Sequence, residues 1–304
     1  MGGLAWLGPA EVSGMAGDPP ALFQQQLMEH SAFIAYLYGA VFVVGFILLV
    51  GFTLWIQTHP ISWAEPVQRL LRRPWTVRDV AVVVTPLLVI QAGFVIGYAV
   101  YAPPEDFPAD RLERVVTAIQ GVLFHVAGLV LVIFLARKKG VGWAEGFGAP
   151  GRRVAGSVLA GGLALLGVMP LIIAYNVSAQ LLMHWWDVTP QVQDVTRIIS
   201  GASGVWAKAY FFVLAVVVAP VVEEVLFRGM LLPALARLVG VRPALVVVAV
   251  LFALVHGLYL PSAIIFFILS IAFSLAYIHR GTLVTPVVMH AAFNALTMIV
   301  LLRM

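Results

Sequence analysis

The sequence predicts an all-α, polytopic membrane protein with about eight transmembrane helices. Hydrophobic residues occupy 62% of the 304 positions and charged residues only 11%, which is more apolar surface than a soluble domain can bury. The hydrophobic residues also form long runs, and about 20 of them span a bilayer as a helix. Between the sixth and seventh runs, Gly257 and Pro261 predict a tight turn. The predicted spans are 32–56, 79–101, 115–136, 154–182, 207–227, 243–260, 261–278 and 283–302.

The distribution of basic residues predicts the orientation of these spans. Loops after spans one, three, five and seven hold thirteen of the 18 Lys and Arg residues, namely Arg69, Arg72, Arg73, Arg78, Arg137, Lys138, Lys139, Arg152, Arg153, Arg228, Arg237, Arg242 and Arg280. By the positive-inside rule these loops are cytoplasmic, so both termini are expected outside the cytoplasm. The net charge of +4 therefore reflects topology, and no nucleic-acid partner is expected. The Ala/Val/Leu/Gly/Arg-rich usage fits a GC-rich bacterium, which favours the inner membrane.

Three parts are expected along the chain. Residues 1–31 are rich in Gly and Pro and contain no Lys or Arg, so they predict a flexible tail without the basic start of a signal peptide. Residues 32–206 predict N-terminal transmembrane helices, and 207–304 predict a C-terminal helical core. The loop 57–78 mixes Trp and Leu with Arg and predicts a short surface helix. Cysteine is absent, which excludes disulfides and cysteine nucleophiles.

Two adjacent carboxylates, Glu223 and Glu224, lie deep inside an apolar run, whereas the other twelve acidic residues lie in polar stretches or at segment ends. A charge at membrane depth costs about 2.5–3.5 kcal/mol on insertion scales, so such residues usually have a function. Glu224 and Arg228 are four residues apart and share a helical face, which predicts an ion pair. Glu223 is rotated by about 100° from that face and can point elsewhere.

Two further polar pairs interrupt the later spans. Phe252 precedes His256 by one helical turn and could line a pocket, and His290 and Asn294 share one helical face. Counted from the nearest helix ends, Glu223 and the two histidines lie about 15–21 Å deep, so they can meet inside the membrane. A buried Glu beside a His is typical of a general base, and the His and Asn on one face suit an oxyanion.

These three motifs, in this order on successive helices, carry a resemblance to a known family. Glu-Glu-x-x-x-Arg at 223–228, Phe-x-x-x-His at 252–256 and His-x-x-x-Asn at 290–294 resemble the signatures of the CPBP family. That family includes CAAX prenyl endopeptidases and bacteriocin-processing enzymes of the ABI type. The resemblance covers about residues 207–300, and all the motif residues match.

The resemblance implies an eight-helix intramembrane glutamic protease without a cofactor. The first Glu and first His would activate water, the second His and the Asn would stabilise the tetrahedral intermediate, and the remaining residues would brace the site. The implied catalytic residues are Glu223, His256, His290 and Asn294, and the implied supporting residues are Glu224, Arg228 and Phe252. The implied substrate is a membrane-anchored or lipidated protein or peptide, cut near its C-terminus. Among bacterial activities, removal of a C-terminal sorting helix (the myxosortase type) is the leading expectation.

Several alternatives stay open. The Glu pair could be a structural ion-pair network, and a family member could have lost proteolysis and act as a scaffold or immunity protein. Glu223, His256 and His290 could instead form a zinc site with two His and one Glu, although no His-Glu-x-x-His motif is present. A transporter would use the same ionisable residues as an ion path, but the paired broken helices of that class are not evident.

Two single residues outside the three motifs, Ser203 and His125, each have a functional and a structural interpretation. Ser203 lies in a Gly-x-Ser-Gly sequence similar to that of rhomboid serine proteases, but a Gly/Ser turn before a helix is the ordinary explanation. His125 stands alone on the third predicted span, and the expectation is a histidine hydrogen-bonded within the bundle rather than a functional one.

Overall fold

The computed structural model describes residues 31–101, 109–148, 154–188, 204–257 and 259–301. Among these residues all regular structure is helical, which confirms the predicted all-α class. The helical elements are α2 Ser31–Thr58, α3 Ala64–Leu71, α4 Val77–Val100, α5 Ala109–Lys138, α6 Trp143–Phe147, α7 Val154–Trp185, α9 Val205–Val213, η1 Leu214–Val218, α10 Ala219–Glu224, η2 Val225–Leu231, α11 Leu232–Val239, α12 Val241–Val255, α13 Leu260–Arg280 and α14 Val284–Leu301.

Seven helical runs in the described part of the chain are long and apolar enough to cross a membrane. They show that the chain is an integral, multi-pass membrane protein. The predicted span 243–260 differs, because it forms the 15-residue helix α12, which ends at Val255. Gly257 then has a φ of +120°, and the next helix starts with Pro261 in its first turn, so one helix cannot continue through this point. The predicted turn is therefore present, and His256 caps a short helix instead of lying within a full span.

The fifth run contains two π-helical segments, which the sequence reasoning did not predict. Each segment ends two residues before a proline, Pro220 after η1 and Pro233 after η2. Proline lacks an N–H and clashes with the preceding turn, and a widened turn accommodates both defects. The short helix α10, which carries both glutamates, lies between these two segments.

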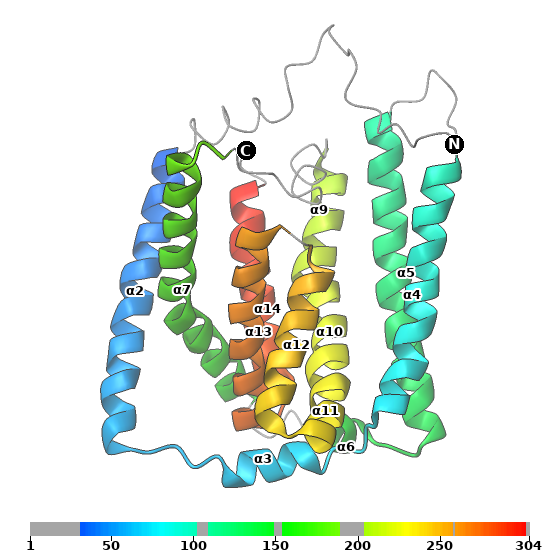
Figure 1. Cartoon of the computed structure of the whole chain (residues 1–304), viewed down its shortest axis with the longest axis horizontal. Coiled ribbons are helices and arrows are strands. Elements are labelled where there is room, and N and C mark those ends of the chain that lie inside the picture. Colours follow the sequence, from blue (N-terminus) through cyan, green and yellow to red (C-terminus); the bar gives the residue numbers. More distant parts are fainter. Residues whose placement is uncertain (1–30, 102–108, 149–153, 189–203, 258, 302–304) are drawn as a thin grey trace, which may run out of the picture.

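The helices form three groups in Figure 1. Helices α9 to α14 lie in the centre, α2 and α7 pack together on one side, and α4 and α5 pack together on the other. α7 also contacts α13 and α14, whereas α5 contacts η1 and α10. The start of α2 and the end of α14 lie at one end of the bundle, and α3, α6 and α11 lie at the other. The predicted surface helix in the loop 57–78 is α3.

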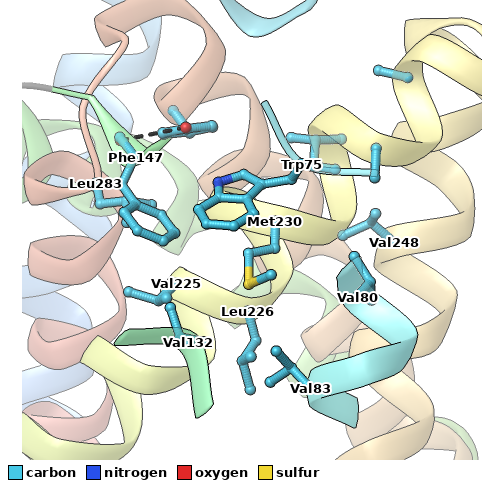
Figure 2. Close-up of a cluster of buried hydrophobic side chains, with 14 of the residues drawn as sticks. Trp75, Val80, Val83, Val132, Phe147, Val225, Leu226, Met230, Val248 and Leu283 are labelled. Atoms are coloured by element: carbon cyan, nitrogen blue, oxygen red, sulfur yellow. Dashed lines mark hydrogen bonds between the residues drawn. The ribbon is translucent and has the colours of Figure 1, made fainter. Parts of the chain in front are cut away.

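A buried apolar cluster joins the first half of the chain to the second at the end marked by α3 and α6. Figure 2 shows the indole of Trp75 within this cluster, near Phe147 and Met230. Trp75 is fully buried, and its Nε1–H donates to the Gly146 carbonyl at 2.8 Å. A Cβ at Gly229 would lie 2.6 Å from the Phe147 ring, so glycine is needed for this approach. The cluster therefore fixes η2, and with it the neighbouring glutamates, against the N-terminal helices.

Candidate active site

Glu224 and Arg228 form the predicted ion pair, and both side chains are completely buried. An Arg228 Nη1 lies 2.8 Å from Glu224 Oε1. The other Arg228 nitrogens donate to Ser270, through its Oγ at 2.8 Å and its carbonyl at 3.2 Å, and to Ser274 Oγ at 3.4 Å. The two serines are one turn apart on α13, so the guanidinium is paired to α10 and α13 at once. A buried charge needs such full pairing.

Glu223 lies beside Glu224 but faces a different set of partners, as its rotation on the helix predicted. Its Oε2 lies 3.4 Å from His256 Nε2 and 3.9 Å from His290 Nε2. Its Oε1 lies 3.8 Å from His125 Nε2. Three imidazoles from α5, the end of α12 and α14 therefore surround a single carboxylate.

Hydrogen bonds on the far side of each ring determine which nitrogen carries a proton. Nδ1 of His256 lies 2.7 Å from the Phe252 carbonyl, and Nδ1 of His290 lies 3.0 Å from Glu224 Oε1. Nδ1 of His125 lies 2.5 Å from the Gly121 carbonyl. Each partner is an acceptor, so each Nδ1 must be the donor. In the neutral rings the three Nε2 atoms facing Glu223 are consequently proton acceptors.

In this arrangement the carboxylate oxygens of Glu223 face the Nε2 atoms of the three histidines, and all of these atoms are acceptors. Among the residues that the structure describes, neither Glu223 Oε2 nor His125 Nε2 has a hydrogen-bond partner. A carboxylate and neutral Nε2 atoms can share a space only if protons, a water molecule or a cation occupy it. The cluster is therefore built to hold a proton-donating or positively charged species next to Glu223.

Asn294 has a partner that the sequence did not predict. Its Nδ2 donates to the Ala215 carbonyl at 2.7 Å. In η1 the Ala219 N–H bonds to the Leu214 carbonyl, five residues back, so the Ala215 carbonyl would require an N–H at position 220. Residue 220 is Pro220, and Asn294 supplies the missing donor. One hydrogen of the Asn294 amide remains for another acceptor.

Phe252 lies against the histidines of the site, one helical turn from His256. Its ring centroid lies 4.3 Å from that of His256 and 5.7 Å from that of His290, and the Arg228 guanidinium lies 4.4 Å from it. Phe273 stacks on His290 at 5.3 Å. The rings hold both histidines in place and exclude bulk water from the ion pair beneath them.

The donor set also fits a metal ion. The ligand atoms of Glu223, His256 and His290 all lie within 4.8 Å of one another. Two His and one Glu are a known set for catalytic zinc. Nδ1–H bonds to a carbonyl and a carboxylate are the outer contacts that usually orient metal-bound histidines.

The structure thus brings together Glu223, His256 and His290, with Phe252 against both rings and Asn294 on the same helix as His290. His125 is hydrogen-bonded within the bundle, as expected, and the sequence did not predict that its Nε2 also lies 3.8 Å from Glu223 Oε1. Sequence reasoning also missed Ser270 and Ser274, although two serines four residues apart in an apolar helix were a usable signal. Ser203 lies outside the described residues.

The fold and this cluster define a class, a multi-pass membrane protein with a buried carboxylate–imidazole centre. Residues 205–296 match the family model of type II CAAX prenyl endopeptidases, described as Rce1-like. The match confirms the resemblance found in the three motifs. It ends before the last turn of α14, and it leaves α2 to α7, with His125, outside. Searches of curated proteins and of solved structures gave no match.

Proposed function

We propose that the chain is an intramembrane glutamic endopeptidase that hydrolyses a peptide bond near the C-terminus of a membrane-associated protein or peptide. The observation that carries the proposal is the convergence of Glu223, His256 and His290, in which both Nε2 atoms lie 3.4 to 3.9 Å from Glu223 Oε2. The family match over residues 205–296 supports the same reaction type, because it implies a protease of the CAAX endopeptidase kind.

In the proposed reaction, a water molecule lies between Glu223 and His256 and donates one hydrogen to each. Glu223 takes a proton as the water oxygen attacks the scissile carbonyl carbon. The carbonyl oxygen becomes an oxyanion, which accepts hydrogen bonds from His290 Nε2–H and from the free hydrogen of the Asn294 amide. His290 can donate from Nε2 only as an imidazolium, because its Nδ1–H is held by Glu224. The proton on Glu223 then passes to the leaving nitrogen as the C–N bond breaks.

The location of the site supports a substrate that is itself in the membrane. Glu223 lies in the middle of the helical run 205–239, so an extended chain must enter the bundle to reach it. A lipid anchor or a C-terminal apolar helix would hold such a chain at this depth. We propose a bacterial inner-membrane location with both termini outside the cytoplasm, and removal of a C-terminal sorting signal as the reaction.

The test compares cells that carry the wild-type chain with cells that carry Glu223→Gln. The amide preserves volume and removes basicity, so substrate C-termini should be intact in the variant and cleaved in the wild type. The measurement is mass spectrometry of membrane-protein C-termini, followed by cleavage of the identified peptide by purified protein. Glu145→Gln is the matched control, because this glutamate is exposed and lies on α6, which carries none of the residues around Glu223. Equal C-termini in all three strains would indicate a scaffold or immunity protein without proteolysis.

A zinc-dependent protease is the second candidate, and the metal-compatible spacing of Glu223, His256 and His290 is the observation that favours it. A metal would polarise the substrate carbonyl or activate the water, and the three residues would hold it. Chelation separates the two mechanisms. Under the glutamic mechanism, cleavage persists in excess chelator and purified protein contains no stoichiometric metal. Loss of cleavage that is restored by zinc, in step with metal content, would replace the glutamic mechanism with the zinc one.

A further inference from the structure

One histidine outside the three motifs, His125 on α5, also faces the site. This histidine lies beyond the residues that match the family model, yet its Nε2 is 3.8 Å from Glu223 Oε1. Its side chain is 12% exposed, and the buried Nε2 has no hydrogen-bond partner among the described residues. Hydrogen bonding within its own helix uses only Nδ1, so a purely local role leaves Nε2 unexplained.

The packing of α5 is adapted to this contact. Gly121 and Gly128 lie one turn on either side of His125 on the same helical face. A Cβ at Gly121 would lie 2.9 Å from a Leu214 methyl group, and one at Gly128 would lie 3.3 Å from a Val222 methyl group. Small residues allow membrane helices to approach closely. The two glycines therefore bring α5 close to η1 and α10 at the level of Glu223.

A carboxylate needs such a contact if only one of its oxygens is to act as a base. The terminal torsion of a Glu side chain is broad, so packing alone does not fix how the two oxygens point. Oε2 faces His256 and His290, whereas Oε1 faces His125. We propose that His125 is a positioning residue for the glutamate: its ring, anchored through Nδ1 to Gly121, shares a proton or a water molecule with Oε1 through Nε2 and thereby aims Oε2 at the other two histidines. This inference rests on the proposed role of Glu223 as the base.

Two amide substitutions separate this role from a structural one. In His125→Asn the amide nitrogen can take the place of Nδ1 and keep the bond to the Gly121 carbonyl, but it does not reach Glu223. In His125→Gln the amide nitrogen can take the place of Nε2 and reach Glu223. Both are measured for kcat and KM on a quenched fluorescent peptide taken from the identified substrate, and for thermal unfolding. Surface-exposed His184 supplies the control variant, His184→Asn.

We expect His125→Asn to lower kcat by about 10²-fold with little change in KM, since a displacement of about 1 Å at a catalytic group can cost that much. His125→Gln should recover at least about tenfold of the lost kcat, and His184→Asn should match the wild type. The proposal is overturned if His125→Asn keeps wild-type turnover, if the Gln variant is no better than the Asn variant, or if the losses follow unfolding temperature.

A spectroscopic measurement tests the contact without requiring proteolysis. The chain has seven histidines, so ¹⁵N-histidine labelling gives a small set of side-chain signals. Signals missing in His125→Gln assign His125, and its Nε2 signal should shift in Glu223→Gln while its Nδ1 signal stays. An unshifted Nε2 signal would overturn the proposal even for an active enzyme. A shifted signal in a protein that cleaves nothing would instead retain the contact and overturn the proposed function.

Discussion

The Glu224→Gln variant should have a lower free energy of unfolding than the Glu223→Gln variant. The Glu224 carboxylate is fully buried, and its Oε1 accepts from both Arg228 and His290, at 2.8 and 3.0 Å. The amide retains the shape of the side chain but not its negative charge. The Gln oxygen can still accept from Arg228, but it is neutral, as are the other partners Ser270 and Ser274. A buried guanidinium without its hydrogen-bonded carboxylate would result.

The expected loss of stability follows from that uncompensated charge. Removing one partner of a buried pair costs about 3–5 kcal/mol, which corresponds to a factor of at least about 10² in the unfolding equilibrium. The aromatic rings around Arg228 offset part of the loss, because Phe252 and Phe273 lie 4.4 and 5.2 Å from the guanidinium. We therefore expect Glu224→Gln to lose about 3 kcal/mol of unfolding free energy, the lower end of that range.

Unfolding in mixed detergent and SDS micelles measures this difference for the wild type, Glu224→Gln, Glu223→Gln, Arg228→Met and the exposed control Glu145→Gln. The double variant Glu224→Gln/Arg228→Met removes both charges, so it should be more stable than Glu224→Gln alone. Its loss of unfolding free energy should also be smaller than the sum of the losses in the two single variants. The reasoning would be refuted if Glu224→Gln were as stable as the wild type. It would also be refuted if the double variant lost more unfolding free energy than the two single variants together.

Three more predictions concern turnover, the Asn294 hydrogen bond and the buried core. His290→Ala and Asn294→Ala should each lower kcat about 10²–10³-fold, with a smaller effect on KM. If both serve one oxyanion, the effects on kcat should be less than additive in the double variant. A change in KM alone would indicate that they are substrate-binding groups. Asn294→Ala should also lower unfolding stability by about 1–3 kcal/mol, because the Ala215 carbonyl loses its donor. Trp75→Ala should cost about 3–5 kcal/mol by emptying a fully buried site; a loss below about 1 kcal/mol in SDS unfolding would contradict the packing shown in Figure 2.

Contacts within one helix were predictable from the sequence. The i,i+4 spacing of Glu224 and Arg228 specified their ion pair, and the same rotation directed Glu223 to other partners. Residue order and depth also indicated that His256 and His290 could reach Glu223. Hydropathy predicted eight spans, and seven helices in the described part of the chain are long and apolar enough to cross a membrane. The sixth predicted span is the shorter helix α12, because hydropathy does not register that Gly257 and Pro261 end this helix early.

Contacts between helices were not predictable in the same way. The period of a helix fixes angles around its own axis, but it says nothing about rotation or displacement relative to a neighbour. His125 is the clearest example, because a single histidine in an apolar run carries no sign of which helix it faces. Its approach depends on Gly121 and Gly128, whose small size matters only against Leu214 and Val222.

Contacts between helices also decided which side-chain nitrogens of His290 and Asn294 remain free to donate. Motif spacing placed His290 and Asn294 on one face as two donors of the same kind. Tertiary packing separated them: Glu224 holds His290 Nδ1, and the Ala215 carbonyl occupies one hydrogen of Asn294. The sequence by itself thus determined the fold class and seven of the apolar spans, and it indicated the candidate residues of the site, because these depend on composition and helical period. Only the tertiary structure decided which atom of each residue faces Glu223, because that depends on hydrogen bonds between helices far apart in the chain.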